Sequence, residues 1–284
     1  MTPGRLLLCA ILLSAAGCAI VVRTDWERPW RLVLLRRFLR TTFMAIWSET
    51  IPEIQYGTYP SNRLEILKPR WPRSGTLPAV IVFHGGGWEF GSREEMRERV
   101  CRRYLERGFV VVNADYRPGL RAASEDAETV VAWSLKNIPA YGGDVGRVVL
   151  TGESAGAHLA LLTAFQSHLR VAAVVNFYGV CDLSRMPNTP AMQRATQGDL
   201  TTILRLSPLH YVRPSGPPVI SIHGTEDELV PLEQTEILTR QVRSAGVVAE
   251  QVLIEHGRHG LSERQLNTAY RAVFEFLHGR GIIR

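Results

Sequence analysis

Hydrophobic positions along most of the chain follow two alternating patterns. Short apolar runs rich in β-branched residues, such as Ala-Val-Ile-Val-Phe at 79–83, are typical of strands that are buried on both faces. Longer segments with an apolar residue every three or four positions are typical of amphipathic helices. The predicted strands are 64–67, 79–83, 109–113, 148–151, 171–177, 219–222 and 249–254. The predicted helices are 94–107, 124–137, 154–165, 232–245 and 262–280.

This alternation predicts an α/β fold with a mostly parallel central sheet and helices on both faces. We find no internal repeat and no linker within residues 51–284, which are therefore predicted to form one domain. Residues 178–217 show no clear periodicity. Because irregular segments of that length are usually functional, we expect this one to shape the mouth of a pocket.

Residues 1–22 have a different pattern. Arg5 precedes an apolar run over 6–22, in which Ser14-Ala15-Ala16-Gly17 is followed by Cys18. A basic start, a short apolar stretch and small residues are typical of a secretory signal. The segment also resembles a bacterial lipobox, which implies lipidation of Cys18 and an exported, membrane-attached protein that faces the periplasm. An uncleaved inner-membrane signal anchor and a cytosolic protein with a fortuitous apolar start remain alternatives.

Residues 23–50 are predicted to contain an amphipathic helix over 30–47. Its two faces are apolar (Leu32, Leu34, Leu35, Phe38, Leu39, Phe43, Ile46) and basic (Arg36, Arg37, Arg40). A basic amphipathic helix can lie in a membrane interface. The same apolar stripe would also suit a helix that packs on the following domain, and the pattern does not choose between these two positions.

Charge and composition narrow the class of protein. The 284 residues include 45% hydrophobic and 21% charged residues, which excludes wholesale disorder. The net charge of +6 first suggests a nucleic-acid or membrane partner. Residues 1–50 contribute +4 of it and the remainder only +2, so the charge favours membrane attachment and not nucleic-acid binding. In the body, Cys101 and Cys181 are expected to be buried free thiols, with a disulfide as the alternative in an oxidising compartment.

The sequence Thr151-Gly152-Glu153-Ser154-Ala155-Gly156 lies between a predicted strand and a predicted helix. It fits the G-x-S-x-G nucleophile elbow, in which a tight turn presents the serine at the edge of the sheet. The start of the helix adds free N–H groups and a positive partial charge. Ser154 is therefore the predicted nucleophile.

A second glycine motif, His84-Gly85-Gly86-Gly87-Trp88, follows the predicted strand 79–83. Three glycines allow backbone N–H groups to approach a developing oxyanion. The segment lacks the third glycine of a dinucleotide-binding loop and the G-K-[ST] of a phosphate loop, which argues against both.

Together these motifs resemble the HGGG-type carboxylesterases of the α/β-hydrolase fold, the hormone-sensitive-lipase-like and BD-FAE-like group. The resemblance covers about residues 54–279 and includes Asp115-Tyr116-Arg117, Tyr141-Gly142-Gly143-Asp144 and His223-Gly224-Thr225-Glu226-Asp227. It implies a short insert after the sixth strand and no cofactor. It also implies an oxyanion hole formed by the N–H groups of Gly86, Gly87 and Ala155.

The acid and the base of a triad are expected after the last two strands, in the order serine, acid, histidine. Glu226, Asp227 and Glu228 all follow strand 219–222, and the family pattern H-G-x-x-D-x-x-V-P selects Asp227. His256 and His259 both follow strand 249–254, and the family's glycine turn before His-Gly selects His259. No nearby Cys or His completes a metal set around the two histidines, so no metal is expected.

The resemblance therefore implies a serine carboxylic-ester hydrolase that acts on small to medium acyl esters. Arylformamidase or amidase, peptidase and carbohydrate deacetylase activities would use the same machinery. A lipase that acts at lipid surfaces and an inactive, membrane-tethered binding module are further alternatives. Trp88, Phe90 and Tyr116 are candidate pocket residues, whereas His84, His158 and His168 are expected to have structural roles. The oligomeric state is left open.

Overall fold

The computed structural model of the chain describes residues 9–11, 20–22, 48–71 and 75–284. The chain divides into two compact units, Met1–Trp47 and Ser48–Arg284. In the first unit, strands β1 (Cys9–Ile11) and β2 (Ile20–Val22) pair antiparallel. Cys18 and the predicted helix 30–47 lie outside the described residues. Within the described ranges, no helix is both long enough and apolar enough to cross a membrane.

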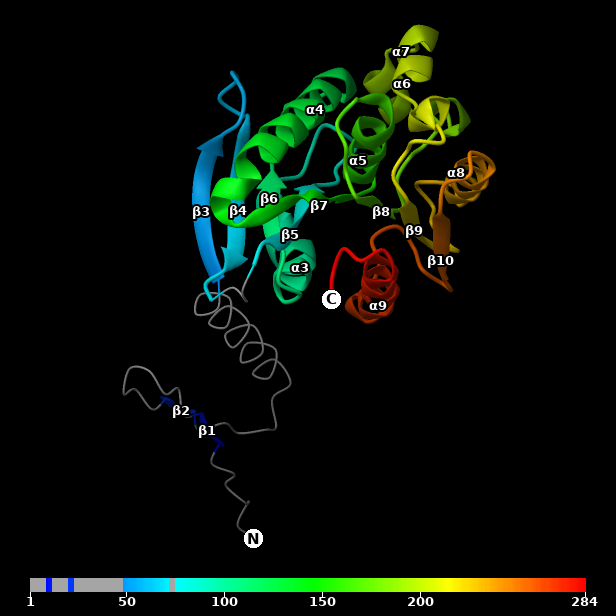
Figure 1. Ribbon diagram of the computed structural model, residues 1–284. Helices are drawn as coiled ribbons and strands as arrows, with labels where there is room; N and C mark the ends of the chain where they lie inside the picture. The colour runs from blue at the N-terminus through cyan, green and yellow to red at the C-terminus, as the bar shows by residue number, and fades with distance from the viewer. Residues whose placement is uncertain (1–8, 12–19, 23–47, 72–74) are drawn as a thin grey trace, which may run out of the picture. The chain divides into compact units, whose positions relative to one another are not determined.

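The second unit is built on an eight-stranded sheet with the order β10-β9-β8-β7-β5-β6-β4-β3 (Figure 1). The six strands from β5 to β10 run parallel to one another, and β4 pairs antiparallel with both β6 and β3. The strands are β3 (Ser48–Gln55), β4 (Arg63–Pro69), β5 (Leu77–Phe83), β6 (Val110–Ala114), β7 (Gly143–Glu153), β8 (Ala173–Phe177), β9 (Val219–Gly224) and β10 (Ala249–Ile254). The predicted, mostly parallel sheet is confirmed.

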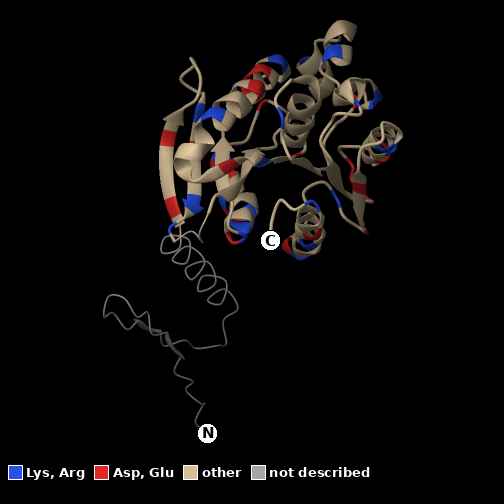
Figure 2. Cartoon of the chain, in the orientation of Figure 1, with Lys and Arg blue, Asp and Glu red and all other residues tan. Residues whose placement is uncertain are grey.

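Helices cover both faces of the sheet, as predicted. Helices α4 (Leu120–Asn137), α5 (Ala155–Gln166) and α8 (Glu233–Ser244) lie on one face, and α3 (Arg102–Leu105) and α9 (Glu263–Gly279) lie on the other (Figure 1). The central strands β5, β6, β8 and β9 are almost entirely buried and contain no charged residue, so the charges lie around them (Figure 2). Burial on both faces explains why their sequences are mostly apolar.

Strand β3 was not predicted. Its sequence, Ser-Glu-Thr-Ile-Pro-Glu-Ile-Gln, contains a proline and two glutamates, a composition that weakens a strand prediction. The structure places it at the edge of the sheet, where a missing N–H is tolerated, with a bulge between Ile51 and Ile54. Glu53 lies within the bulge and has a φ of 55°.

The predicted helix 94–107 is interrupted. It consists of α2 (Arg93–Met96), a π-helical turn (Arg97–Cys101) and α3. A π-helical turn inserts extra backbone per turn and redirects the side chains that follow it. No periodicity in the sequence identifies such a turn, because the flanking residues keep a helical pattern.

The segment 178–217 follows β8, which is the sixth strand of the large sheet. It contains two short helices, α6 (Pro190–Thr196) and α7 (Leu200–Arg205), between two single 3₁₀ turns (Leu183–Arg185 and Pro208–Tyr211). The side chains of Thr189 and Asp199 cap the two helices. Such short helices have no amphipathic period to recognise, which is why the sequence appeared irregular here.

The two cysteines of the body, Cys101 and Cys181, are buried free thiols, as expected, and the alternative of a disulfide is wrong. Burial raises the pKa of both thiols above the usual value. They therefore behave as small apolar side chains of the core.

His158 of α5 connects the loop after β5 to the insert. The indole Nε1–H of Trp88 donates to Nδ1 of His158 at 3.1 Å, and Nε2 of His158 lies 2.7 Å from the carbonyl oxygen of Leu206. The imidazole is fully buried and meets the Trp88 ring edge-on. Because Nδ1 accepts and Nε2 donates, this neutral tautomer satisfies both partners. Burial lowers the pKa of His158 to about 4.

This buried histidine predicts a loss of stability in acid. Unfolded His158 binds a proton below pH 6.5, but folded His158 does so only near pH 4, so the free energy of unfolding falls as the pH falls between these values. The lowered pKa corresponds to roughly 3 kcal/mol between pH 7 and pH 4. Urea unfolding of the wild type and of His158→Gln at both pH values measures it. The variant is expected to lose about 3 kcal/mol less, and equal losses would contradict the prediction.

Candidate active site

Ser154 occupies the turn between β7 and α5 in a backbone conformation that is rare for a residue with a side chain. Its φ is 54° and its ψ is −118°. Its N–H donates to the carbonyl of Phe177 at 2.9 Å, and its own carbonyl accepts the N–H of His158. Strain of this kind costs of order 1–3 kcal/mol and persists where the surroundings fix it. The predicted nucleophile elbow is therefore present as a conformation.

Two glycines make this turn possible by close backbone approach. A Cβ on Gly156 would lie 2.2 Å from the carbonyl oxygen of Phe83 and 2.4 Å from that of His84. A Cβ on Gly152 would lie 2.3 Å from the carbonyl carbon of Gly156. No side chain fits at either position, so the motif's glycines pack the first turn of α5 against the end of β5.

The glycine loop after β5 lies beside Ser154. A Cβ added to Gly85 would be 3.8 Å from Cβ of Ser154. Gly86 has a φ of 115°, and its carbonyl accepts N–H bonds from Glu89 and Phe90. Ala155 begins α5, where an N–H has no partner within the helix. The structure therefore brings the loop that holds Gly86 and Gly87 next to Ser154 and Ala155, as an oxyanion hole requires.

Buried aromatic contacts hold the start of this loop. The ring of Tyr116 stacks on that of His84 with centroids 4.0 Å apart, and its hydroxyl donates to the His84 carbonyl at 2.8 Å. Burial lowers the pKa of His84, whose Nδ1 lies 2.7 Å from the carbonyl oxygen of Gly85. His84 thus shapes the loop.

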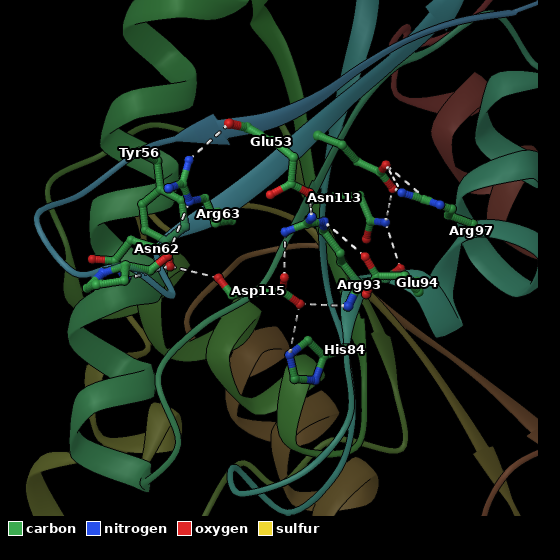
Figure 3. Close-up of polar contacts among 12 residues, drawn as sticks. Glu53, Tyr56, Asn62, Arg63, His84, Arg93, Glu94, Arg97, Asn113 and Asp115 are labelled. Atoms are coloured by element: carbon green, nitrogen blue, oxygen red, sulfur yellow. Dashed lines mark hydrogen bonds and ion pairs between the residues drawn. The ribbon is translucent and has the colours of Figure 1, made fainter.

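A chain of charges continues from His84 to the edge of the sheet (Figure 3). Asp115 lies 4.0 Å from Nε2 of His84 and accepts the backbone N–H and the guanidinium of Arg93 at 2.8 and 2.6 Å. Arg93 also pairs with Glu53, and the Tyr56 hydroxyl donates to the carbonyl of Asp115. These contacts make the unpredicted strand β3 part of the support of the glycine loop.

Asp227 and His259 form a hydrogen-bonded pair after the last two strands. Nδ1 of His259 lies 2.8 Å from Oδ2 and 3.0 Å from Oδ1 of Asp227. The N–H groups of Leu229 and Val230 donate to Oδ1, and Nε2 of His223 lies 3.3 Å from Oδ2. The carboxylate has no exposed surface. Burial opposes its ionisation, but the hydrogen bonds from His223, His259 and Val230 prevail and hold the pKa of Asp227 well below its usual value.

The competing acids and the competing base have other partners. Glu226 pairs with His256, and both side chains are largely exposed. The bond to Glu226 raises the pKa of His256. Glu228 pairs with Arg258. Of the three adjacent acids, only Asp227 is buried against a histidine of the last loop, which agrees with the choice made from the motif.

Tyr178 links these two parts of the site. Its N–H donates to the carbonyl of Ile222 in β9, while Ser154 donates to the neighbouring Phe177. Its ring contacts that of His259, with centroids 4.8 Å apart. Ser154, Tyr178 and the Asp227–His259 pair therefore follow one another along the carboxyl edge of β7, β8, β9 and β10, where α/β folds place their sites. Their catalytic roles stay predictions.

The three candidate pocket residues differ in their surroundings. Trp88 and Tyr116 are only 5% and 6% exposed, and their polar atoms are bonded to His158 and His84. These contacts favour support of the glycine loop. Phe90 is 72% exposed, so it is the candidate that is free to meet a substrate.

Other parts of the site were missed from the sequence. They include Arg99 and Tyr178, whose contacts come from residues far along the chain, and His223, which lies 3.3 Å from Asp227. His223 carried a signal, since it lies four positions before Asp227 in the quoted motif. Arg99 carried none, because one arginine in a charged helix looks like any other.

Comparisons with known proteins agree with this geometry. The family model described as BD-FAE matches residues 64–242. The chain is 30% identical to the "Probable carboxylic ester hydrolase LipM" of Mycobacterium tuberculosis over 79% of this chain, but it spans only 60% of that protein's length.

Two solved structures of one protein are also similar. Native esterase 2 of Thermogutta terrifontis is 27% identical with a TM-score of 0.71, covering 84% of this chain and 94% of that chain. The same esterase phosphonylated by sarin is 26% identical with a TM-score of 0.74, covering 83% and 96%. The matched family region covers more than half of the chain and includes both glycine motifs and Asp227. The chain therefore belongs to the BD-FAE family and has the α/β-hydrolase fold.

Proposed function

We propose that the protein is a serine carboxylic-ester hydrolase that acts on small to medium acyl esters through an acyl-enzyme. One observation carries the proposal: the strained Ser154 lies beside a glycine loop, on the same sheet edge as the buried Asp227–His259 pair. LipM, named a probable carboxylic ester hydrolase, and esterase 2, which sarin phosphonylates, support hydrolysis of esters.

In the proposed mechanism, His259 takes the proton of Ser154 as its oxygen attacks the ester carbonyl. The N–H groups of Gly86, Gly87 and Ala155 stabilise the oxyanion. His259 then protonates the leaving alcohol, and water releases the acid in a second cycle of the same steps. Asp227 holds the imidazole through Nδ1 and stabilises its charged form, which suits a carboxylate that stays ionised.

Hydrolysis of p-nitrophenyl esters with acyl chains of two to sixteen carbons tests the reaction and the substrate class. We expect the highest kcat/KM with the shorter acyl groups and a loss of roughly 10⁴-fold or more in Ser154→Ala, because no other group can form the acyl-enzyme. Equal rates in the two proteins would refute the mechanism. Parallel assays with anilides, formanilides and acetylated sugars distinguish the amidase, arylformamidase and deacetylase alternatives, and a sharp rise on micellar substrate would indicate a lipase. A chain inactive on all of them would be a binding module.

Substitution of Asp227 and of the adjacent Glu226 tests the assignment of Asp227. Asp227→Asn is expected to lower kcat by about 10⁴-fold, because an amide stabilises neither the tautomer nor the charged imidazole. Glu226→Gln removes an equal charge from an exposed neighbour that pairs with His256, and it is expected to keep kcat near wild type. His259→Ala and His256→Ala form the same comparison for the base. Loss of activity in His256→Ala alone would reverse that choice.

We further propose that the chain is an exported lipoprotein attached to the membrane through Cys18, in which the arginines of residues 23–40 bind anionic lipid. Arg5, the apolar run and the small residues before Cys18 support this address. Metabolic labelling of the full chain in a bacterial host with an alkyne fatty acid tests it. The label is expected to be lost in Cys18→Ser and kept in the control Cys9→Ser. An unlabelled wild type that remains in the membrane fraction would indicate a signal anchor.

A further inference from the structure

Arg99 contacts three parts of the candidate site with one guanidinium. Its Nε donates to both carboxylate oxygens of Glu153, the residue before Ser154, at 2.8 and 3.0 Å. Its Nη2 donates to the carbonyl of Leu261, two residues after His259, at 3.2 Å. The same Nη2 lies 3.4 Å from the hydroxyl of Tyr178, whose ring packs on His259.

The π-helical turn places this arginine. Arg97 and Arg99 belong to the same five-residue turn, but Arg97 pairs with Glu65 of β4 and Arg99 pairs with Glu153 of β7. Single π-helical turns within helices occur frequently at functional sites. Here the turn directs two cations to different strands, and only Arg99 reaches both the nucleophile elbow and the histidine loop.

The contact between Arg99 and Glu153 is also an ion pair, which neutralises the carboxylate. The Glu153 side chain is only 12% exposed. Glu153 and Tyr178 raise the pKa of Arg99 despite its partial burial, so the guanidinium stays charged. Without Arg99, the Glu153 carboxylate would remain beside Tyr178 with no cation bonded to it. The other groups that face His259 are Asp227, bonded to Nδ1, and Glu228, which accepts the His259 N–H and pairs with Arg258.

We propose that Arg99 is a positioning residue of this hydrolase: it fixes the histidine loop relative to the nucleophile elbow and neutralises Glu153 beside them. The inference rests on the proposed function. A misplacement of about 1 Å between reacting groups can lower the rate roughly 10²-fold. We therefore expect the loss of the Arg99 contacts to lower kcat. An uncompensated carboxylate near an imidazole favours the charged form of the base.

The test is the pH dependence of kcat/KM with p-nitrophenyl butyrate, whose acid limb reports the base of the free enzyme. In Arg99→Met, kcat is expected to fall about 10–100-fold with little change in KM, and the acid limb is expected to move up by roughly half a pH unit or more. In Arg99→Met with Glu153→Gln, the limb returns to the wild-type position while kcat stays low. Glu153→Gln alone moves the limb below wild type, because the guanidinium is then unopposed.

Two further variants separate charge from geometry. Arg99→Lys keeps the charge but loses the planar fork, so the limb stays near wild type while kcat falls. Arg102→Met is the matched control, since among the described residues the ion pairs of Arg102 are with Glu98 and Glu106 of its own helix segment. It removes the same charge and is expected to keep both the limb and kcat.

The proposal would be overturned if Arg99→Met and wild type had the same acid limb in the pH profile of kcat/KM and the same kcat. A lower melting temperature of Arg99→Met with no change in the pH profile or kcat would also overturn it. If Arg99→Met does not fold, Glu153→Gln and Arg99→Lys decide the matter, and unchanged profiles in both overturn it. If the wild-type activity is lost in Ser154→Ala but the acid limb does not move in the Arg99 variants, the proposed hydrolase function is retained and the role of Arg99 is rejected. A wild type without Ser154-dependent activity would instead remove the proposed function itself.

Discussion

The candidate site depends on one steric constraint, the contact between the first turn of α5 and the end of β5. Gly156 lies so close to the carbonyls of Phe83 and His84 that any side chain there would displace them. That contact fixes the turn that holds Ser154 at φ 54°, and it sets the distance between the turn and the glycine loop that follows β5. Ser154 and the glycine loop are therefore positioned by the same backbone packing.

Buried charges are tolerated around this turn only because each has a partner. Asp227 is held by two histidines and two N–H groups, and Arg93 is held by Asp115 and Glu53. Removal of one member of such a set leaves an uncompensated buried charge, which costs more than the intact set contributes. The polar groups of the site are therefore held in one arrangement, because any other arrangement would leave a buried charge without a partner.

Short, local patterns in the sequence were enough to predict the parallel sheet and to select the candidate triad residues. Ser154, Asp227 and His259 each follow a predicted strand within a recognisable motif, and the parallel sheet follows from apolar runs alone. Strand β3 was not predicted, because its proline and charged residues weaken a strand prediction. Such residues are tolerated at the edge of a sheet, and the sequence of a strand does not show its position in the sheet. Arg99 was not predicted to belong to the site, because its partners lie 54, 79 and 162 positions away in the chain. Contacts at such separations are fixed by packing and leave no periodic trace.

The same distinction bears on substrate choice. Trp88 and Tyr116 were predicted to line the pocket, but their polar atoms make structural hydrogen bonds. Tyr116 donates to the carbonyl of His84 in the glycine loop. Trp88 donates to His158, which in turn bonds the carbonyl of Leu206 in the insert. The insert is further bound to α4 by the Arg121–Asp199 pair. We therefore expect substrate specificity to depend more on the 178–217 segment and on the exposed Phe90 than on Trp88 and Tyr116.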